Sequence, residues 1–152
     1  MIRLISALML VLLIASPGFG QQSLVGTYKL VSIVTEVDGA PRLTMGQAPR
    51  GYLVITPTRF VCFMTGETRK FGTSVDEKTA LFDSLVGYGG TYRVEGDKFV
   101  ETPEISWTEN LKPQALTFQL SGNRLTTTWG PTPWPRDPTK TMVNRRVWEK
   151  IE

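Results

Sequence analysis

Three hairpin signatures constrain the fold of this chain more than any other feature. Each consists of two short segments rich in β-branched, aromatic and other apolar residues, joined by only two residues: Pro57-Thr58, Gly96-Asp97 and Gly122-Asn123. In the last two signatures, glycine supplies the positive φ that tight hairpin turns require. Short strands at this spacing favour a β-sandwich or a β-barrel.

The complete pattern predicts eight antiparallel strands and one helix. We expect strands at 24–37, 51–56, 59–64, 91–95, 98–107, 115–121, 124–130 and 141–150, with a polar loop at 38–50 and a proline-rich loop at 131–140. Eight antiparallel strands can close into an up-and-down barrel that leaves no exposed sheet edge. The sequence therefore predicts an all-β fold.

The predicted α-helix lies between the third and fourth of these strands. Ser74 and Glu77 have the spacing of a capping box, and Asp76 adds a second acid that suits the positive end of the helix dipole. Apolar residues follow at helical spacing as far as Val86, and glycines from Gly87 onward predict the end of the helix. We expect this helix to pack on the outside of the barrel or across one end.

Residues 1–20 have the pattern of a secretory signal peptide. Arg3 precedes an apolar or small stretch of 12 residues, and small residues follow at Gly18 and Gly20. The stretch is shorter than the roughly 20 residues that a membrane-spanning helix needs, although an uncleaved anchor remains the alternative. We expect export to the periplasm or the cell exterior, no stable membrane span after cleavage, and one domain over residues 21–152.

Composition excludes several classes of chemistry. The 152 residues include no histidine, which removes Ser-His-Asp and Cys-His nucleophile systems, histidine-ligated zinc and proximal-histidine haem. Without Arg3 of the leader, 16 basic residues face 14 acidic ones, too small an excess to indicate nucleic-acid binding. The single Cys62 excludes an intrachain disulfide, and its apolar neighbours favour a buried thiol over an intermolecular bond. We expect no metal, no cofactor and no recognisable catalytic constellation, so an enzyme is the less favoured class.

Hairpin register identifies the residues that share the inner face. Residues at opposed positions of two paired strands lie on one face of the sheet, and this count gives an inner face that is mostly apolar and aromatic. A barrel of eight strands is either filled by such side chains or holds one small ligand. We predict that a ligand is bound by Leu30, Ser32, Leu53, Ile55, Phe60, Cys62, Met64, Tyr92, Val94, Phe99, Glu101, Trp107, Leu116, Phe118, Thr127 and Trp129. For Trp107 this holds only if no bulge interrupts its strand.

Three polar residues, Glu101, Asn144 and Arg146, also fall on the predicted inner face. A buried carboxylate needs a partner or a ligand, which makes Glu101 the one weak candidate for catalysis. Burial raises the pKa of a glutamate, so it could act as an acid or base together with Tyr92 or Arg146. The alternative is that a bulge turns Glu101 outward or that it pairs with an arginine near the rim.

Three stretches, in order along the chain, resemble the lipocalin-like domain family of small bacterial and fungal proteins. They are residues 24–32, 49–57 and 90–97, and Tyr28 in the first stands where tryptophan is commoner. The resemblance implies a calycin β-barrel with an internal ligand site. It supports a fold more than an activity, because one fold serves many functions.

The same resemblance implies how the barrel closes. Gly26 and Tyr28 would lie at the closed end, where an arginine of the last strand, Arg145 or Arg146, covers the Tyr28 ring. Pairing of the first and last strands would also bring Trp148 near Tyr28. A guanidinium over an aromatic face contributes roughly 0.5–2 kcal/mol.

The combined prediction is an exported barrel that binds a small, largely apolar molecule. One alternative is a calycin-type cyclase or isomerase that uses Glu101 as its buried carboxylate. Another is a filled barrel that acts through its surface as an inhibitor or adaptor, with Trp134 of the proline-rich loop as the contact. Against that, Trp134 could fold back and cap the end of the barrel.

Overall fold

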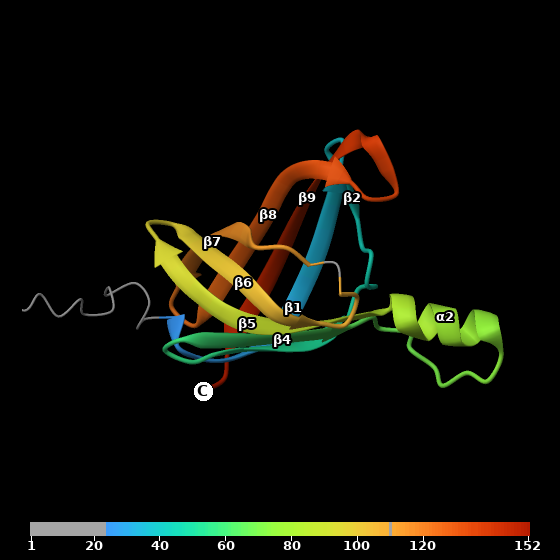
Figure 1. Cartoon of the computed structure of the whole chain (residues 1–152), viewed down its shortest axis with the longest axis horizontal. Coiled ribbons are helices and arrows are strands. Elements are labelled where there is room, and N and C mark those ends of the chain that lie inside the picture. Colours follow the sequence, from blue (N-terminus) through green and yellow to red (C-terminus); the bar gives the residue numbers. More distant parts are fainter. Residues whose placement is uncertain (1–23, 110) are drawn as a thin grey trace, which may run out of the picture.

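The computed structural model describes residues 24–109 and 111–152, so the predicted signal peptide lies outside the described residues. The elements are β1 (Gly26–Val37), β2 (Ala40–Arg42), β3 (Arg50–Ile55), β4 (Arg59–Thr65), α2 (Val75–Asp83), β5 (Leu85–Glu95), β6 (Lys98–Ser106), β7 (Gln114–Ser121), β8 (Arg124–Trp134) and β9 (Asp137–Lys150). Within the described residues, nine strands form one antiparallel sheet, which closes because β1 also pairs with β9. Figure 1 shows the strands curving around a common interior, as the predicted all-β barrel requires.

The predicted hairpin registers are confirmed at all three two-residue turns. The glycines at two of these turns, Gly96 and Gly122, both have a φ of +60°. Glycine adopts this left-handed conformation at low cost because it has no Cβ. The opposed pairs include Leu53–Cys62, Ile55–Phe60, Tyr92–Glu101, Val94–Phe99, Phe118–Thr127 and Leu120–Leu125. Two-residue turns therefore fix the inner face of six strands.

The helix differs from its prediction in position and extent. The segment that we expected to be a polar loop contains an additional short strand, β2. The helix therefore follows the fourth strand of the structure, β4, and not the third. The capping box of Ser74 and Glu77 is present, but the helix ends at Asp83, with Ser84 as its C-cap, and Val86 belongs to β5. No residue of α2 is buried, and Figure 1 shows the helix standing beyond one end of the strands.

The glycines that we expected to end the helix lie inside β5 instead. Gly87 and Gly89 pair with β4, and Gly90 approaches the backbone of β6 so closely that a Cβ there would lie 2.1 Å from the carbonyl oxygen of Thr102. Glycine suits such an approach because it has no side chain. Strand pairing has thus outweighed the weak local preference of a glycine-rich segment.

A bulge in β1 changes which of its residues face inward. The register against β9 shifts between Leu30 and Ser32, so the alternation of faces restarts there. Beyond the bulge the buried positions are Ile33, Thr35 and Val37, whereas Ser32 is only partly buried. The predicted inward position of Ser32 is therefore wrong.

A second bulge, in β6, turns Trp107 outward. Gly90 pairs with Pro103 and Gly89 pairs with Ile105, which leaves one extra residue between them. Ile105 is consequently 71% exposed and Trp107 is 47% exposed. The predicted inward position of Trp107 is wrong, since its ring packs outside the barrel on Phe82 of α2, with ring centroids 5.1 Å apart.

Most of the segment that we expected to be a proline-rich loop belongs to strands β8 and β9. Only two residues, between Trp134 and Asp137, lie outside these strands. β8 continues to Trp134 and β9 begins at Asp137, and the backbone of Thr141 pairs with Asp38 next to the end of β1. Trp134 lies under the guanidinium of Arg42 (5.6 Å to the ring centroid) and lines a surface pocket with the inward residue Met142. It therefore lies over one end of the barrel instead of projecting from a free loop.

The closing seam between β1 and β9 contains a lysine where we expected an arginine. Tyr28 pairs with Lys150, whose Nζ lies 5.8 Å from the ring centroid, and the Tyr28 hydroxyl donates to the carbonyl oxygen of Leu24 (2.9 Å). The prediction that an arginine covers Tyr28 is wrong, because the register places Arg146 opposite Ile33.

The other two residues expected to close the barrel do lie in this seam. Trp148 is fully buried and its Nε1 donates to Thr127 Oγ1 (3.3 Å). A Cβ on Gly26 would come within 2.4 Å of Lys150 Cε. Both observations describe a tightly packed junction between the first and last strands.

Candidate functional site

The carboxyl group of Glu101 lies inside the barrel, as the register of its hairpin predicted. The side chain is 3% exposed. Gln114 Nε2 donates to its Oε2 (2.7 Å), and the Tyr88 hydroxyl makes a long contact with its Oε1 (3.5 Å). Burial raises the pKa of Glu101, while the positive charge of Arg146 and the two hydrogen bonds act in the opposite direction.

Arg146 extends the polar cluster toward the other end of the barrel. Its Nη1 donates to the Tyr88 hydroxyl (2.8 Å) and its Nε donates to Asn144 Oδ1 (2.9 Å). Asn144 Nδ2 in turn donates to Thr35 Oγ1 (2.9 Å), which contacts Thr44 Oγ1 (3.2 Å). A continuous row of polar side chains therefore crosses an otherwise apolar interior.

The tyrosine beside Glu101 is not the one expected from the sequence. Tyr88, from the glycine-rich part of β5, contacts both Glu101 and Arg146. The Tyr92 hydroxyl donates instead to the backbone oxygen of Thr56 (2.8 Å), and its ring stacks on Phe99. Sequence analysis missed Tyr88 because it placed this segment at the end of the helix, where no inward face is defined.

Burial sets the protonation of the remaining titratable groups in the cluster. It raises the pKa of the Cys62 thiol to about 12 and the pKa of Tyr88 well above its ordinary value, so both groups are neutral near pH 7. Burial opposes the charge of Arg146, but the negative charges that Tyr88, Cys62 and Glu101 carry when ionised outweigh it and raise the pKa of Arg146. The interior therefore contains a permanent positive charge.

A small chamber lies against this polar cluster. Its volume is about 10 Å³, which is room for about one water. Its wall is formed by Leu24, Leu53, Ile55, Cys62, Tyr88, Phe99, Glu101, Leu116, Phe118, Leu125, Thr127, Arg146 and Trp148. Side chains therefore fill most of the interior of this barrel.

Most of the predicted inner-face residues line this chamber or pack around it. Leu53, Ile55, Cys62, Phe99, Glu101, Leu116, Phe118 and Thr127 line it. The others in the same core are Leu30, Phe60, Met64, Tyr92, Val94 and Trp129. Ser32 and Trp107 lie elsewhere. The lining residues outside the predicted ligand-binding set are Leu24, Tyr88, Leu125, Arg146 and Trp148, of which only Leu24 and Tyr88 were not predicted to face inward.

In residues 24–109 and 111–152, no group of three or more cysteine, aspartate or glutamate side chains could hold a metal ion. In the same part of the chain, no helix is long and apolar enough to cross a membrane.

The fold and its chamber define the class of protein. It is a closed antiparallel β-barrel whose interior combines apolar walls with a buried polar cluster, an architecture that suits the binding of small molecules. The profile of the lipocalin-like domain matches residues 25–151, and the chain therefore belongs to the lipocalin-like domain family. Neither the curated proteins nor the solved structures that were searched include a match.

Proposed function

We propose that the barrel binds a small, mostly hydrophobic molecule whose polar end accepts hydrogen bonds from Arg146. The guanidinium of Arg146 carries the proposal. It lines the chamber, yet among the described residues its Nη2 has no hydrogen-bond partner and no acid lies within ion-pairing distance. The Arg146 side chain is partly buried, and an acceptor such as a carboxylate or carbonyl oxygen would complete its hydrogen bonds.

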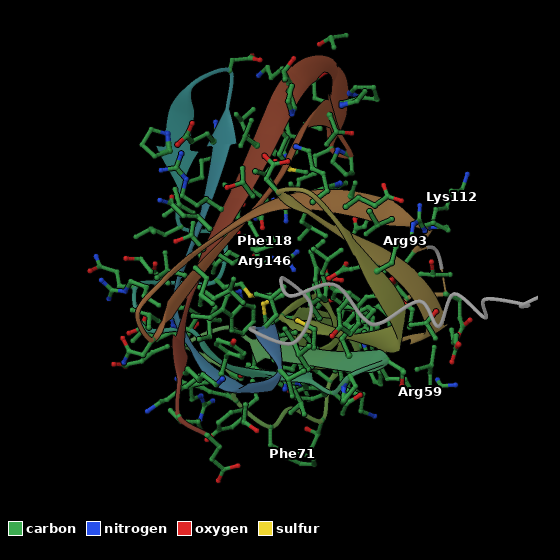
Figure 2. The ribbon with its side chains drawn as sticks, turned by 90° about the vertical axis from the view of Figure 1, so that its left-hand side faces the viewer. Arg59, Phe71, Arg93, Lys112, Phe118 and Arg146 are labelled. Carbon is green, nitrogen blue, oxygen red and sulfur yellow. The ribbon has the colours of Figure 1, made fainter. Side chains whose placement is uncertain are left out.

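The apolar body of the ligand would lie among the side chains that surround the chamber. Because the chamber has room for about one water, a larger ligand must displace part of its wall. Phe118 and Arg146 are only partly buried, unlike most of that wall, and Figure 2 shows both in the middle of the view, surrounded by strands. Rotation of these two side chains would enlarge the chamber without opening the sheet.

The experiment compares two neighbouring arginines of β9. Arg146→Gln removes the partly buried cation of the chamber wall, and the matched control Arg145→Gln removes the exposed one next to it. We would titrate each protein with cis-parinaric acid, a fluorescent apolar carboxylate, and record native mass spectra of wild-type protein purified from its own host. Tyr88→Phe, which removes one hydroxyl, provides a milder test of the same cluster.

Binding by the wild type that is unchanged in Arg145→Gln and at least tenfold weaker in Arg146→Gln would support the proposal, since a lost charged hydrogen bond is worth about 1.5–3 kcal/mol. Far-ultraviolet circular dichroism would verify that each variant is folded. If Arg146→Gln is not folded, the affinity of Tyr88→Phe decides the test in its place. Absence of both a bound mass and probe binding in the wild type would overturn it. So would unchanged affinity in a folded Arg146→Gln or, where that variant does not fold, in Tyr88→Phe.

One observation favours a second candidate function, that of a cyclase or isomerase. Glu101 is enclosed beside Tyr88, and its raised pKa is the property that a buried general acid needs. We would incubate the molecule released from the barrel with catalytic amounts of wild-type or Glu101→Gln protein. A product formed only by the wild type would support catalysis, and recovery of unchanged molecule would reject it.

We also propose that the chain is exported, on the evidence of its leader. Residues 1–20 combine a positive start, a short apolar stretch and small residues near the end. The intact mass of protein isolated from the host tests this proposal. Loss of residues 1–20 would support export, and a full-length chain in the cytoplasm would contradict it.

A further inference from the structure

An apolar surface covers the outside of the barrel between β3 and β6. Its members are Tyr52, Val54, Val61, Phe63, Phe82, Ile105 and Trp107, all at least partly exposed, and we call them the apolar outer face. Tyr52 pairs with Phe63 across β3 and β4, and Val54 pairs with Val61. This surface is on the opposite side of the sheet from the chamber, so it is independent of the proposed ligand site.

Glycines of β5 make this surface continuous. A Cβ on Gly87 would lie 3.2 Å from the Phe63 ring and 3.9 Å from Trp107 Cβ, and one on Gly89 would lie 3.3 Å from Val61 Cγ2. Side chains of β4 and β6 therefore border a strand that presents no side chain at these positions. Contiguous exposed apolar surfaces on soluble domains usually mark sites of interaction.

A groove with a mostly apolar lining, bordered by three basic residues, lies beside the apolar outer face. Its volume is about 490 Å³, and it is lined by Arg50, Gly51, Tyr52, Phe63, Thr65, Arg69, Lys70, Phe71 and Leu81. Three of these residues are basic and none is acidic. The Phe71 side chain is 89% exposed, and Figure 2 shows it at the edge of the molecule, with the green strands between it and Arg146.

We propose that the apolar outer face and this groove dock on an anionic lipid bilayer. Aromatic and aliphatic side chains next to lysine and arginine are the composition of surfaces that lie in the membrane interface. Arg50 and Lys70 would meet acidic headgroups, while Phe71 and the rings of the apolar outer face enter the boundary with the acyl chains. The aliphatic stems of the basic side chains can extend along the same apolar surface.

Charge favours a membrane over a second copy of this chain. The exposed apolar residues, Phe71 included, have a solvent-accessible surface on the order of 800 Å². One partner of a protein–protein interface of standard size buries about this much surface. The groove, however, is lined by three basic residues and no acid. The neighbouring Glu104 is bound to Arg59, and Glu77 of the adjoining pocket accepts hydrogen bonds from the backbone of Thr73 and Ser74. A bilayer with acidic headgroups supplies the charge that complements the three basic residues.

The helix supports the same conclusion. α2 has nine residues and none is buried, whereas isolated helices shorter than about 12 residues are marginal in water. Val75 and Phe82 are exposed along it, and Leu81 lines the groove. A bilayer that covers the groove would also cover apolar residues of α2.

The test uses the full chain and vesicles of phosphatidylcholine with or without phosphatidylglycerol. Co-sedimentation would be measured for wild type, Lys70→Glu, Phe71→Ser and the control Leu43→Ser, which replaces an exposed leucine away from the groove. We expect binding that requires phosphatidylglycerol and weakens with salt. We expect Leu43→Ser to bind normally and each of the other two variants to lose roughly tenfold in partitioning.

Fluorescence quenching by brominated lipids locates the docked surface. The signal of Trp107 should be quenched, so Trp107→Phe should remove most of the quenching and Trp134→Phe should not. The leader is common to all variants, and binding through it would leave partitioning unchanged in Lys70→Glu and Phe71→Ser. That result would overturn the proposal, and so would unquenched Trp107 or a wild type that does not bind vesicles. A wild-type protein that forms a dimer, does not bind vesicles and becomes monomeric in Phe71→Ser would also overturn it.

Discussion

Glu101 and Arg146 carry most of the electrostatics of the interior. They come from β6 and β9, and Tyr88 lies between them with contacts to both. The inward position of Glu101 could be predicted, because a two-residue turn fixes the pairing of its strand with Tyr92. The contact with Tyr88 could not be predicted, because it depends on how β5 pairs with β4 and β6.

The raised pKa of Glu101 predicts how its contribution to stability depends on pH. A group that holds its proton more tightly in the folded state contributes stability that is fully present below its unfolded pKa, ~4.3, and is lost as pH rises through the higher folded pKa. Glu101→Gln cannot ionise. The free energy of unfolding of the variant, relative to wild type, should therefore increase as pH rises from about 4 to about 7.

Urea unfolding of both proteins across this pH range would measure the difference. Because the two proteins are compared at the same pH, the contributions of the other titrating groups to the free energy of unfolding largely cancel in the difference. A difference that is constant with pH, or that falls as pH rises, would contradict a raised pKa for Glu101.

At the scale of elements, the two bulges decide where side chains point. Period-two alternation predicts a face only as long as each residue has one partner, and a bulge reverses the alternation. In β1 this transfers the inner face from Ser32 to Ile33, and in β6 it turns Ile105 and Trp107 outward. The bulge in β6 therefore provides two members of the apolar outer face.

Gly90 is the position where this arrangement is most sensitive to substitution. A Cβ there would lie 2.1 Å from the carbonyl oxygen of Thr102 and 2.8 Å from the amide nitrogen of Glu104, both backbone atoms that cannot rotate away. We expect Gly90→Ala to lower the free energy of unfolding by about 3 kcal/mol, at the upper end of overpacking costs.

Gly66→Ala is the matched control, because its nearest neighbour would lie 3.6 Å away, at an ordinary contact distance. Its free energy of unfolding should change by less than about 1 kcal/mol. Denaturant unfolding of the two variants would show whether the close approach matters. Equal effects would mean that the backbone of β6 adjusts to an added methyl group.

For the whole molecule, closure through β1 and β9 joins the inward side chains into one core. Residues from both ends of the chain meet there, since Leu24, Tyr28 and Trp148 are all fully buried. Barrel strands that each depend on both neighbours have no edge from which to unfold separately. Outside this core stands α2, which has no buried residue.

We therefore expect the barrel to unfold in one cooperative step. Tryptophan fluorescence of the Trp107→Phe variant, to which the buried Trp148 contributes, and the strand signal in circular dichroism should give the same midpoint within error. A helical signal that melts at lower temperature would be consistent with the exposed α2. Separate midpoints for fluorescence and strand signal would contradict a single core.

The sequence by itself determined the all-β class, the hairpins and the inward position of most chamber residues. These features are local: a two-residue turn fixes the register, and the register fixes the face on which Leu53, Phe99 or Glu101 lies. The family resemblance, which its profile over residues 25–151 confirms, added the closed barrel.

Only the tertiary structure decided the features that depend on pairing between distant segments. Both bulges, the extension of β5 through its glycines and the place of Lys150 over Tyr28 arise where strands far apart in the chain adjust to each other. Local preferences there are weak, since glycine favours neither helix nor strand and a single extra residue leaves no periodic signal. The contacts of Arg146 with Tyr88 and Asn144, and with them the polar cluster, follow from that closure.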